Sequence, residues 1–104
     1  MTPPQNERDE ELATAVRPEA KEPPLYKVLL NNDDFTTMEF VVLILEQVFN
    51  RSSDDAMRIM LLVHTTGMGV AGTYTWEVAE MKVARTTALA RANEYPLLCT
   101  IEVA

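Results

Sequence analysis

Three consecutive polar residues, Asn32, Asp33 and Asp34, separate two apolar segments of different periodicity. The run before them, residues 25–31, is short, apolar and aromatic, which predicts a β-strand. The segment after them, residues 38–49, repeats apolar residues at helical spacing, and its stripe is wide enough to predict a helix buried on more than one side. The folded part is therefore expected to begin with a strand, a tight polar turn and a buried helix.

Capping signals mark where the first two helices begin. Thr36, with Glu39 three residues later, matches a capping box and predicts a helix start near Thr37. Ser52, with Asp55 three residues later, predicts the start of a second helix in the same way. Two helices in succession are therefore expected after the first strand.

A glycine and a proline delimit the remaining elements. Gly67 predicts the end of the second helix through a left-handed cap conformation. Residues 68–74 then predict a strand whose glycines indicate a bend or a close backbone approach. Thr75 predicts the cap of a third, alanine-rich helix, and residues 97–103, after Pro96, predict a last strand. The order β-α-α-β-α-β predicts a two-layer α/β (α+β) sandwich, in which a three-stranded antiparallel sheet packs against three helices.

The beginning of the chain differs from the rest in composition. Residues 1–24 carry five of the six prolines and few large apolar residues, so burial cannot offset the entropy of ordering them. This composition predicts a disordered N-terminal arm. One small core domain over residues 25–104 is expected to follow it.

Charge and cysteine content restrict the class of protein. The formal net charge of -7 argues against nucleic acid, whose phosphates need a basic surface, and favours a cationic ligand or a basic partner. The single cysteine, Cys99, cannot form an internal disulfide, and its apolar neighbours are typical of a buried core thiol. No secretory signal or apolar run of membrane-spanning length is visible, so we expect a cytoplasmic protein without membrane contact.

The turn at residues 32–34 crowds an amide and two carboxylates beside an apolar surface. Such a site suits a ligand with a cationic end and an apolar side chain, and His64, the only histidine, offers a further polar group. Three alternatives stay open at this point: an ordinary Asx-rich turn, an acidic face that docks a basic partner, and a small enzyme that uses Asp33, Asp34 and His64 with a metal. The metal site is disfavoured because there is no second histidine and no paired ligand spacing, so we predict no metal and no cofactor.

Several large side chains could either fill the core or contact a ligand or partner. Met38, Met57 and Met60 are expected to fill the core, although thioether side chains also recur at apolar binding surfaces. Trp76, at the start of the third helix, is expected to be exposed, either as a partner contact or as a hydrophobic staple.

Four blocks of sequence, in the right order, resemble one family. Residues 26–40 (YKVLLNNDDFTTMEF) closely resemble the ClpS adaptors of the bacterial Clp protease, and so do RIMLLVH at 58–64, TWEVAEMKVA at 75–84 and NEYPLLCTIE at 93–102. The resemblance covers about residues 25–103, which is nearly the whole expected core domain. It implies a monomeric binding adaptor without catalytic activity of its own.

ClpS-like proteins bind substrates whose N-terminal residue is Leu, Phe, Tyr or Trp, and they deliver these substrates to the hexameric unfoldase ClpA for degradation by ClpP. The resemblance implies that Asn32, Asp34 and His64 bind the substrate's α-amino group and that Asp33 supports the turn. Glu77 and Lys82 match family positions that face the N-terminal domain of ClpA. The N-terminal arm would engage the unfoldase during delivery.

The resemblance also implies a pocket for the first side chain of the substrate. Its lining would consist of Thr36, Met38, Val41, Met60, Val63 and Leu97. Within it, Met38 would act as a gate that rejects β-branched residues.

This sequence departs from the usual family pattern at a few positions. Asn31 is polar where an apolar residue is usual, and we expect it to adjoin the pocket and to alter its preference. Thr37 replaces a common proline, and Ala71 stands where a cysteine is frequent. Trp76 neighbours Glu77, so we expect it to tune the contact with the unfoldase.

Overall fold

The computed structural model of the chain describes residues 23–104. Its elements are, in chain order, β2 (Tyr26–Asn31), α1 (Met38–Gln47), α2 (Ser53–Thr66), β3 (Met68–Tyr74), α3 (Trp76–Ala92) and β4 (Leu98–Val103). The predicted order β-α-α-β-α-β is confirmed, with small shifts at the ends of the elements. The N-terminal arm predicted for residues 1–24 lies outside the described residues, apart from Pro23 and Pro24.

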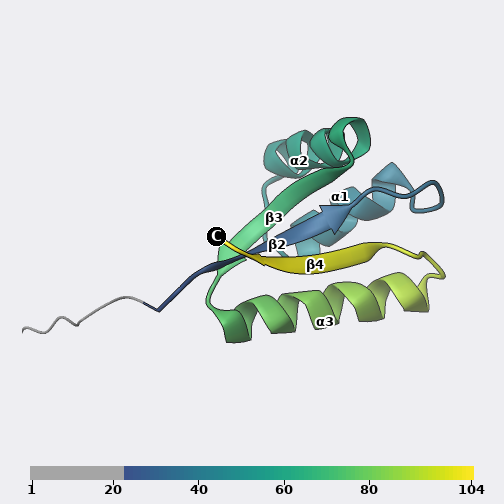
Figure 1. Cartoon of the computed structure of the whole chain (residues 1–104). Coiled ribbons are helices and arrows are strands. Elements are labelled where there is room, and N and C mark those ends of the chain that lie inside the picture. Colours follow the sequence, from purple (N-terminus) through teal and green to yellow (C-terminus); the bar gives the residue numbers. More distant parts are fainter. Residues whose placement is uncertain (1–22) are drawn as a thin grey trace, which may run out of the picture.

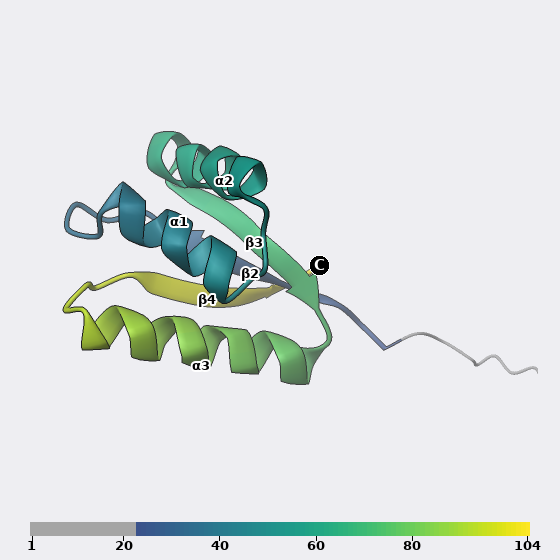
Figure 2. The same ribbon diagram turned by 180° about the vertical axis from the view of Figure 1, so that it is seen from behind.

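The central strand of the sheet is β2. The strand order is β3-β2-β4, and β2 pairs antiparallel with both of its neighbours. Figures 1 and 2 show the three helices over one face of this sheet, with α1 lying between α2 and α3. The two-layer sandwich expected from the sequence is therefore confirmed.

The core lies between the sheet and the helix layer. Val28 and Leu30 reach it from β2, because side chains two residues apart lie on the same face of a strand. They meet the buried side chains of α1 and of the residues just after it, which are Phe40, Val41, Ile44, Leu45, Val48 and Phe49. Leu43, on the other side of α1, is exposed. The helix is therefore buried over one wide face, and the expectation of burial on more than one side is wrong at Leu43.

The N-cap of α1 is Thr37 rather than Thr36. The Thr37 hydroxyl accepts a hydrogen bond from the backbone N–H of Phe40 at 3.1 Å. The Thr36 hydroxyl instead donates to the carboxylate of Asp33 at 2.7 Å. The capping box predicted at Thr36 is therefore wrong by one residue, because Asp33 engages the side chain of Thr36.

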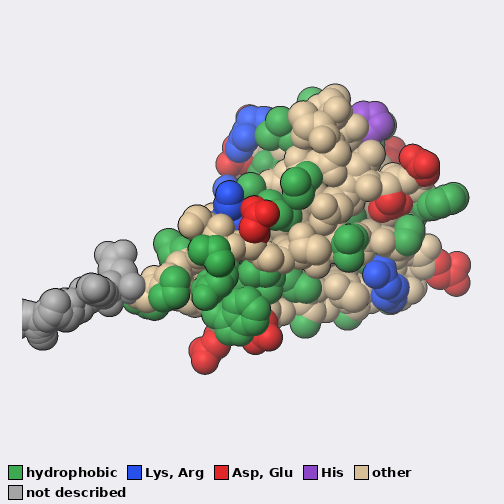
Figure 3. Space-filling model, viewed as in Figure 1, with side chains coloured by type: hydrophobic (Ala, Val, Ile, Leu, Met, Phe, Trp, Pro, Cys, Tyr) green, Lys and Arg blue, Asp and Glu red, His purple; other side chains and the backbone are tan. Residues whose placement is uncertain are grey.

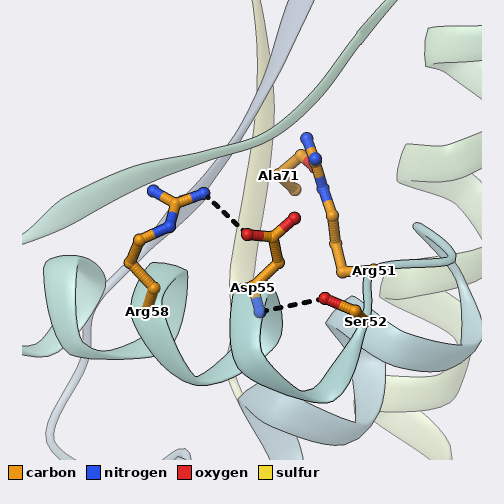
Figure 4. A network of polar contacts seen from close by, with 5 residues as sticks. All are labelled: Arg51, Ser52, Asp55, Arg58 and Ala71. Atoms are coloured by element: carbon orange, nitrogen blue, oxygen red, sulfur yellow. Dashed lines mark hydrogen bonds and ion pairs between the residues drawn. The ribbon is translucent and has the colours of Figure 1, made fainter.

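The loop between α1 and α2 is anchored to the sheet, as Figure 4 shows. The Ser52 hydroxyl accepts a hydrogen bond from the backbone N–H of Asp55 at 3.2 Å, which confirms the predicted cap of α2. Asp55 also forms an ion pair with Arg58 at 3.3 Å. The side chain of Arg51 donates from Nε to the carbonyl oxygen of Ala71 in β3 at 2.8 Å. These contacts fix the start of α2 relative to β3.

Two glycines determine the path from α2 into β3. Gly67 has a φ angle of 94° and caps α2, and its N–H donates to the carbonyl oxygen of Val63 at 3.0 Å. A Cβ atom on Gly69 would lie 2.8 Å from Cγ2 of Val63, which is closer than carbon atoms pack. Gly69 therefore lets α2 lie directly on β3. The predicted helix cap and the predicted close backbone approach are both confirmed.

The long helix α3 packs through small side chains. Ala79, Thr86 and Ala90 are fully buried, which lets the helix lie close to the sheet. Thr75 occupies the N-cap position in extended backbone, but its side chain makes no capping hydrogen bond. Neither α3 nor any other helix within residues 23–104 has both the length and the apolar content needed to span a membrane.

Candidate binding cavity between α1 and α2

A cavity of about 380 Å³ lies between the turn that follows β2, the first turns of α1 and the last turns of α2. It is lined by most of the residues that the sequence singled out, namely Asn32, Asp33, Asp34, Thr36, Met38, Val41, Met60, Val63 and His64. In Figure 3 the histidine and several carboxylates lie at the end of the molecule where the turn between β2 and α1 is found in Figure 1. One end of the cavity is polar, and most of the rest of its wall is apolar.

A backbone contact brings the two polar segments of the cavity together. The N–H of Asn32 donates to the carbonyl oxygen of Gly67, the residue that caps α2, at 2.9 Å. His64 lies in the last turn of α2, so this hydrogen bond places the turn at residues 32–34 beside it. The spacing of these residues in the sequence could not show this proximity.

Asp33 organises the turn. Its Oδ1 accepts hydrogen bonds from the backbone N–H groups of Phe35 and Thr36 at 2.8 Å and 2.7 Å, and its Oδ2 accepts from the Thr36 hydroxyl. Partial burial by itself would raise the pKa of Asp33. The hydrogen bonds from Thr36 and Phe35, together with the positive charge of Arg91, outweigh that effect and hold the pKa below its ordinary value of 3.8. Asp33 is therefore an anion committed to the turn itself.

Asp34 differs from its neighbour. Its side chain is exposed and accepts no hydrogen bond from any residue in the described part of the chain. The carboxylate therefore remains free to accept hydrogen bonds from a ligand. Asn32 and His64 are likewise exposed at the same end of the cavity, where they can offer further polar groups.

The apolar part of the cavity combines a fixed floor with an adaptable rim. Val41 and Val63 belong to the buried core, and so does Met60. Met38, at the rim, is 46% exposed, and a thioether chain there can adopt several rotamers. The prediction that the methionines fill the core is therefore correct for Met60 and wrong for Met38, as well as for Met57, which is 49% exposed.

Comparison with known proteins identifies the family. The model of the family described as "ATP-dependent Clp protease adaptor protein ClpS" matches residues 21–100. This chain belongs to the ClpS family. It is 59% identical over 92 residues to the ClpS of Hyphomonas neptunium, covering 88% of this chain and 78% of that protein. It is 55% identical to a ClpS of Caulobacter vibrioides, covering 88% of this chain and 84% of that protein.

A solved structure supports the same assignment. The structure of Agrobacterium tumefaciens ClpS2 bound to L-phenylalaninamide superposes with a TM-score of 0.76 at 38% sequence identity. The match covers 80% of this chain and the whole of that one. The fold described above is therefore the ClpS fold, and the resemblance seen in the sequence is confirmed at the level of the family.

Two residues expected at or beside the ClpS pocket are not among those that line the cavity. Leu97 is buried in the core and does not line the cavity. The side-chain amide of Asn31 donates toward β4, to the carbonyl oxygen of Leu98 at 3.2 Å and to the hydroxyl of Thr100 at 3.3 Å. Asn31 is likewise absent from the lining of the cavity, so its polar side chain faces the neighbouring strand instead.

The two residues expected to face the unfoldase both lie on α3, in different environments. Glu77 is exposed in the first turn. Lys82 is partly buried, and its ammonium group donates to the carbonyl oxygen of Val48, at the end of α1, at 2.6 Å. The same ammonium lies 5.6 Å from the ring centre of Tyr74. Lys82 therefore joins α3 to the end of α1.

Trp76 is exposed, as expected, and it also packs against the sheet. It is 47% exposed, and its ring meets the ring of Tyr26 edge-on with centres 5.2 Å apart. The contact with Tyr26 therefore joins the start of α3 to β2 and leaves about half of the Trp76 side chain exposed.

Sequence reasoning missed two residues of the cavity wall. Thr37 and Glu39 line it because the turn places the N-terminus of α1 at the cavity mouth. Their position within the first turn of a helix that adjoins the polar turn was the available signal. Within residues 23–104, no three His, Cys, Asp or Glu side chains converge as a ready set of metal ligands.

Proposed function

We propose that the cavity binds the N-terminal residue of proteins that begin with Leu, Phe, Tyr or Trp, and that the chain delivers these proteins to a ClpA-type unfoldase for degradation by ClpAP. The observation that carries this proposal is the division of roles within the turn. Asp33 is used internally, whereas Asp34, beside Asn32 and His64, is free at the polar end of an otherwise apolar cavity.

The chemistry of a protein N-terminus matches this arrangement. An α-amino group has a pKa of about 7.7–8.0, so it is mostly cationic near neutral pH. Hydrogen bonds to charged groups contribute roughly 1.5–3 kcal/mol each, and full burial of a Leu or Phe side chain contributes about as much again. After the costs of association, these terms are compatible with micromolar or tighter affinity, near -8 kcal/mol.

The known relative supports the choice of ligand. Agrobacterium tumefaciens ClpS2 was solved with L-phenylalaninamide, which combines a free α-amino group with an aromatic side chain. In this chain, Asn32, Asp34 and His64 would hold the amino group, and Thr36, Met38, Val41, Met60 and Val63 would surround the side chain. Met38 at the rim would exclude side chains that branch at Cβ.

Delivery needs a second surface, for which α3 is the candidate. Glu77 is exposed there for contact with the N-terminal domain of the unfoldase, and Lys82 retains two ammonium protons beyond the one donated to Val48. In this proposal the chain acts as a cytoplasmic monomer and contributes no catalysis and no cofactor.

Fluorescence anisotropy tests the recognition step. A labelled peptide that starts with Leu is titrated beside the same peptide with an acetylated N-terminus. The proposal expects binding of the free peptide at about micromolar or lower concentration and no measurable binding of the acetylated one. Equal binding of the two peptides, or binding of neither, would overturn it.

A degradation assay tests delivery separately. A fluorescent protein that begins with Leu is incubated with a ClpA-type unfoldase, ClpP and the full chain. Glu77→Arg is expected to slow degradation while leaving peptide affinity unchanged. Glu94→Arg, at an exposed position beyond the other end of α3, serves as the charge-matched control and is expected to deliver normally.

A further inference from the structure

A second hollow lies next to the cavity, also between α1 and α2. It has a volume of about 370 Å³ and is lined by Met38, Glu39, Val42, Met57 and Met60. Met38, Glu39 and Met60 line both hollows. The two spaces are therefore neighbours that share a wall made mostly of methionine side chains.

The lining of this second hollow is apolar apart from one carboxylate. Val42 is partly buried, and Met57 is 49% exposed. Methionine side chains adapt to ligands of different shape at low cost. Glu39 places a negative charge at the edge, which disfavours an acidic group in the hollow.

We propose that this hollow binds the apolar side chain of the second residue of the ligand, so that the chain selects for two consecutive residues. The proposal rests on the function proposed above, which places the first residue in the neighbouring cavity. It adds a specificity determinant, Met57, that lies outside that cavity.

The geometry of a peptide supports this assignment. Consecutive Cα atoms are only 3.8 Å apart across a trans peptide bond. With the first side chain in the cavity and the amino group at the end formed by Asn32, Asp34 and His64, the second Cα lies about 4 Å from the first, within reach of the residues that line both hollows. Since Met38 and Met60 separate the two hollows, the next side chain needs to pass only that wall to reach the second one.

Three peptides that differ only at the second residue test the proposal. Each begins with Phe, followed by Ala, Leu or Asn, and each affinity is measured with the full chain by fluorescence anisotropy. Burial of part of a Leu side chain predicts about five- to tenfold tighter binding than Ala. Asn, which is similar in size to Leu but polar, should bind no more tightly than Ala. A further peptide carries Ala second and Leu third.

Two surface variants locate the effect. Met57→Ser should abolish the preference for Leu and leave the affinity for the Phe-Ala peptide unchanged. Leu61→Ser is the matched control, because Leu61 is about equally exposed one turn later on α2 and lines neither hollow. It should retain the full preference. Circular dichroism confirms that both variants are folded.

The outcomes separate this proposal from the one on which it rests. Equal affinity for the Ala and Leu peptides, a preference that survives in Met57→Ser, or a gain from Leu at the third position alone would overturn the assignment while leaving N-terminal recognition intact. Failure of the Phe-Ala peptide to bind at all would overturn both.

Discussion

The two sides of the helix layer are built from side chains of different kinds. Between α1 and α2, long methionines leave two adjoining hollows, and Met38 and Met57 are about half exposed. Where α3 packs on the sheet, the small residues Ala79 and Ala90 are fully buried and bring the helix close to the strands. The closely packed α3 and the methionine-lined space between α1 and α2 together suit a protein that binds side chains of different shapes.

Polar groups follow the same division. Asp33 in the turn has all its hydrogen bonds supplied by neighbours, and Asp34 beside it is left free. In the packed half, Thr86 is fully buried, and its hydroxyl has no oxygen or nitrogen partner in the described part of the chain but lies beside the Cys99 thiol, a weak hydrogen-bonding group. Burial raises the pKa of the Cys99 thiol to about 11 and outweighs the lowering effect of the Thr86 hydroxyl, so the thiol stays protonated, as expected of a core cysteine. Polar groups at the turn thus include one that is free to meet a ligand, whereas those of α3, such as Lys82, are used to hold the fold together.

The largest effect is expected from Asp34→Ala. Removal of the free carboxylate takes away a charge-assisted partner of the ligand's amino group, and the affinity for a Leu-start peptide should fall roughly 100-fold. Because Asp34 makes no hydrogen bond to the described residues, the melting temperature should not change. Asp54→Ala, at another exposed position with the same change of charge, should bind normally. Comparable losses in both variants would point to general electrostatics instead.

Asp33→Ala should act on stability as well as on binding. It leaves the N–H groups of Phe35 and Thr36 and the Thr36 hydroxyl without their acceptor, which we expect to cost about 2–3 kcal/mol of unfolding free energy. Urea unfolding measures this loss. Asp33→Asn keeps an acceptor oxygen and should lose less, and an unaltered unfolding midpoint in the alanine variant would contradict the role given to Asp33.

The pH dependence of stability gives a second test of Asp33. Its pKa is lower in the folded chain than its ordinary value of 3.8. The resulting stability is fully present above the unfolded pKa and is lost as the pH falls through the lower folded value. Urea titrations between about pH 6 and about pH 2.5 should therefore show a loss in the parent chain that is smaller in Asp33→Asn.

Val41→Phe should narrow the cavity. Val41 is buried at the floor, so a larger side chain fills space that the ligand needs, and the affinity for a Phe-start peptide should fall at least about tenfold. Val70→Phe, on the exposed side of β3, provides an equal increase in volume away from the cavity and should bind normally. Unchanged binding of the Phe-start peptide by Val41→Phe would refute the placement of Val41.

The smallest effect is expected from Thr86→Val. The substitution keeps the shape of the side chain and removes a buried hydroxyl that has no oxygen or nitrogen partner and lies beside only the weakly hydrogen-bonding Cys99 thiol. The protein should be as stable as before or more stable by about 1 kcal/mol. Peptide affinity should not change, because Thr86 belongs to the packed half. A loss of more than about 1 kcal/mol in chemical denaturation would show that the hydroxyl contributes to the fold.

The periodic parts of the fold could be predicted from the sequence, because apolar spacing and caps are local signals. Ser52 and Gly67 each mark their helix end correctly. The sequence alone does not distinguish Thr36 from Thr37 as the cap of α1, because the two threonines are adjacent and only the contact of Thr36 with Asp33 separates their roles. The sequence also suggested the polar end of the cavity, but its pairing with His64 depends on the bond between Asn32 and Gly67. The exposure of Met38 and Met57 depends on how α1 and α2 are spaced, and periodicity does not determine that spacing.

The methionine methyl groups offer the most direct measurement of the central claim, which is that the free end of a peptide binds between α1 and α2. In a chain labelled at its six methionines, carbon–proton spectra are recorded as L-phenylalaninamide is added. The account predicts that the signals of Met38 and Met60 shift, whereas those of Met68 in β3 and Met81 in α3 stay in place. N-acetylated phenylalaninamide should shift none of them. Unmoved signals for Met38 and Met60, or equal shifts with the acetylated compound, would contradict it.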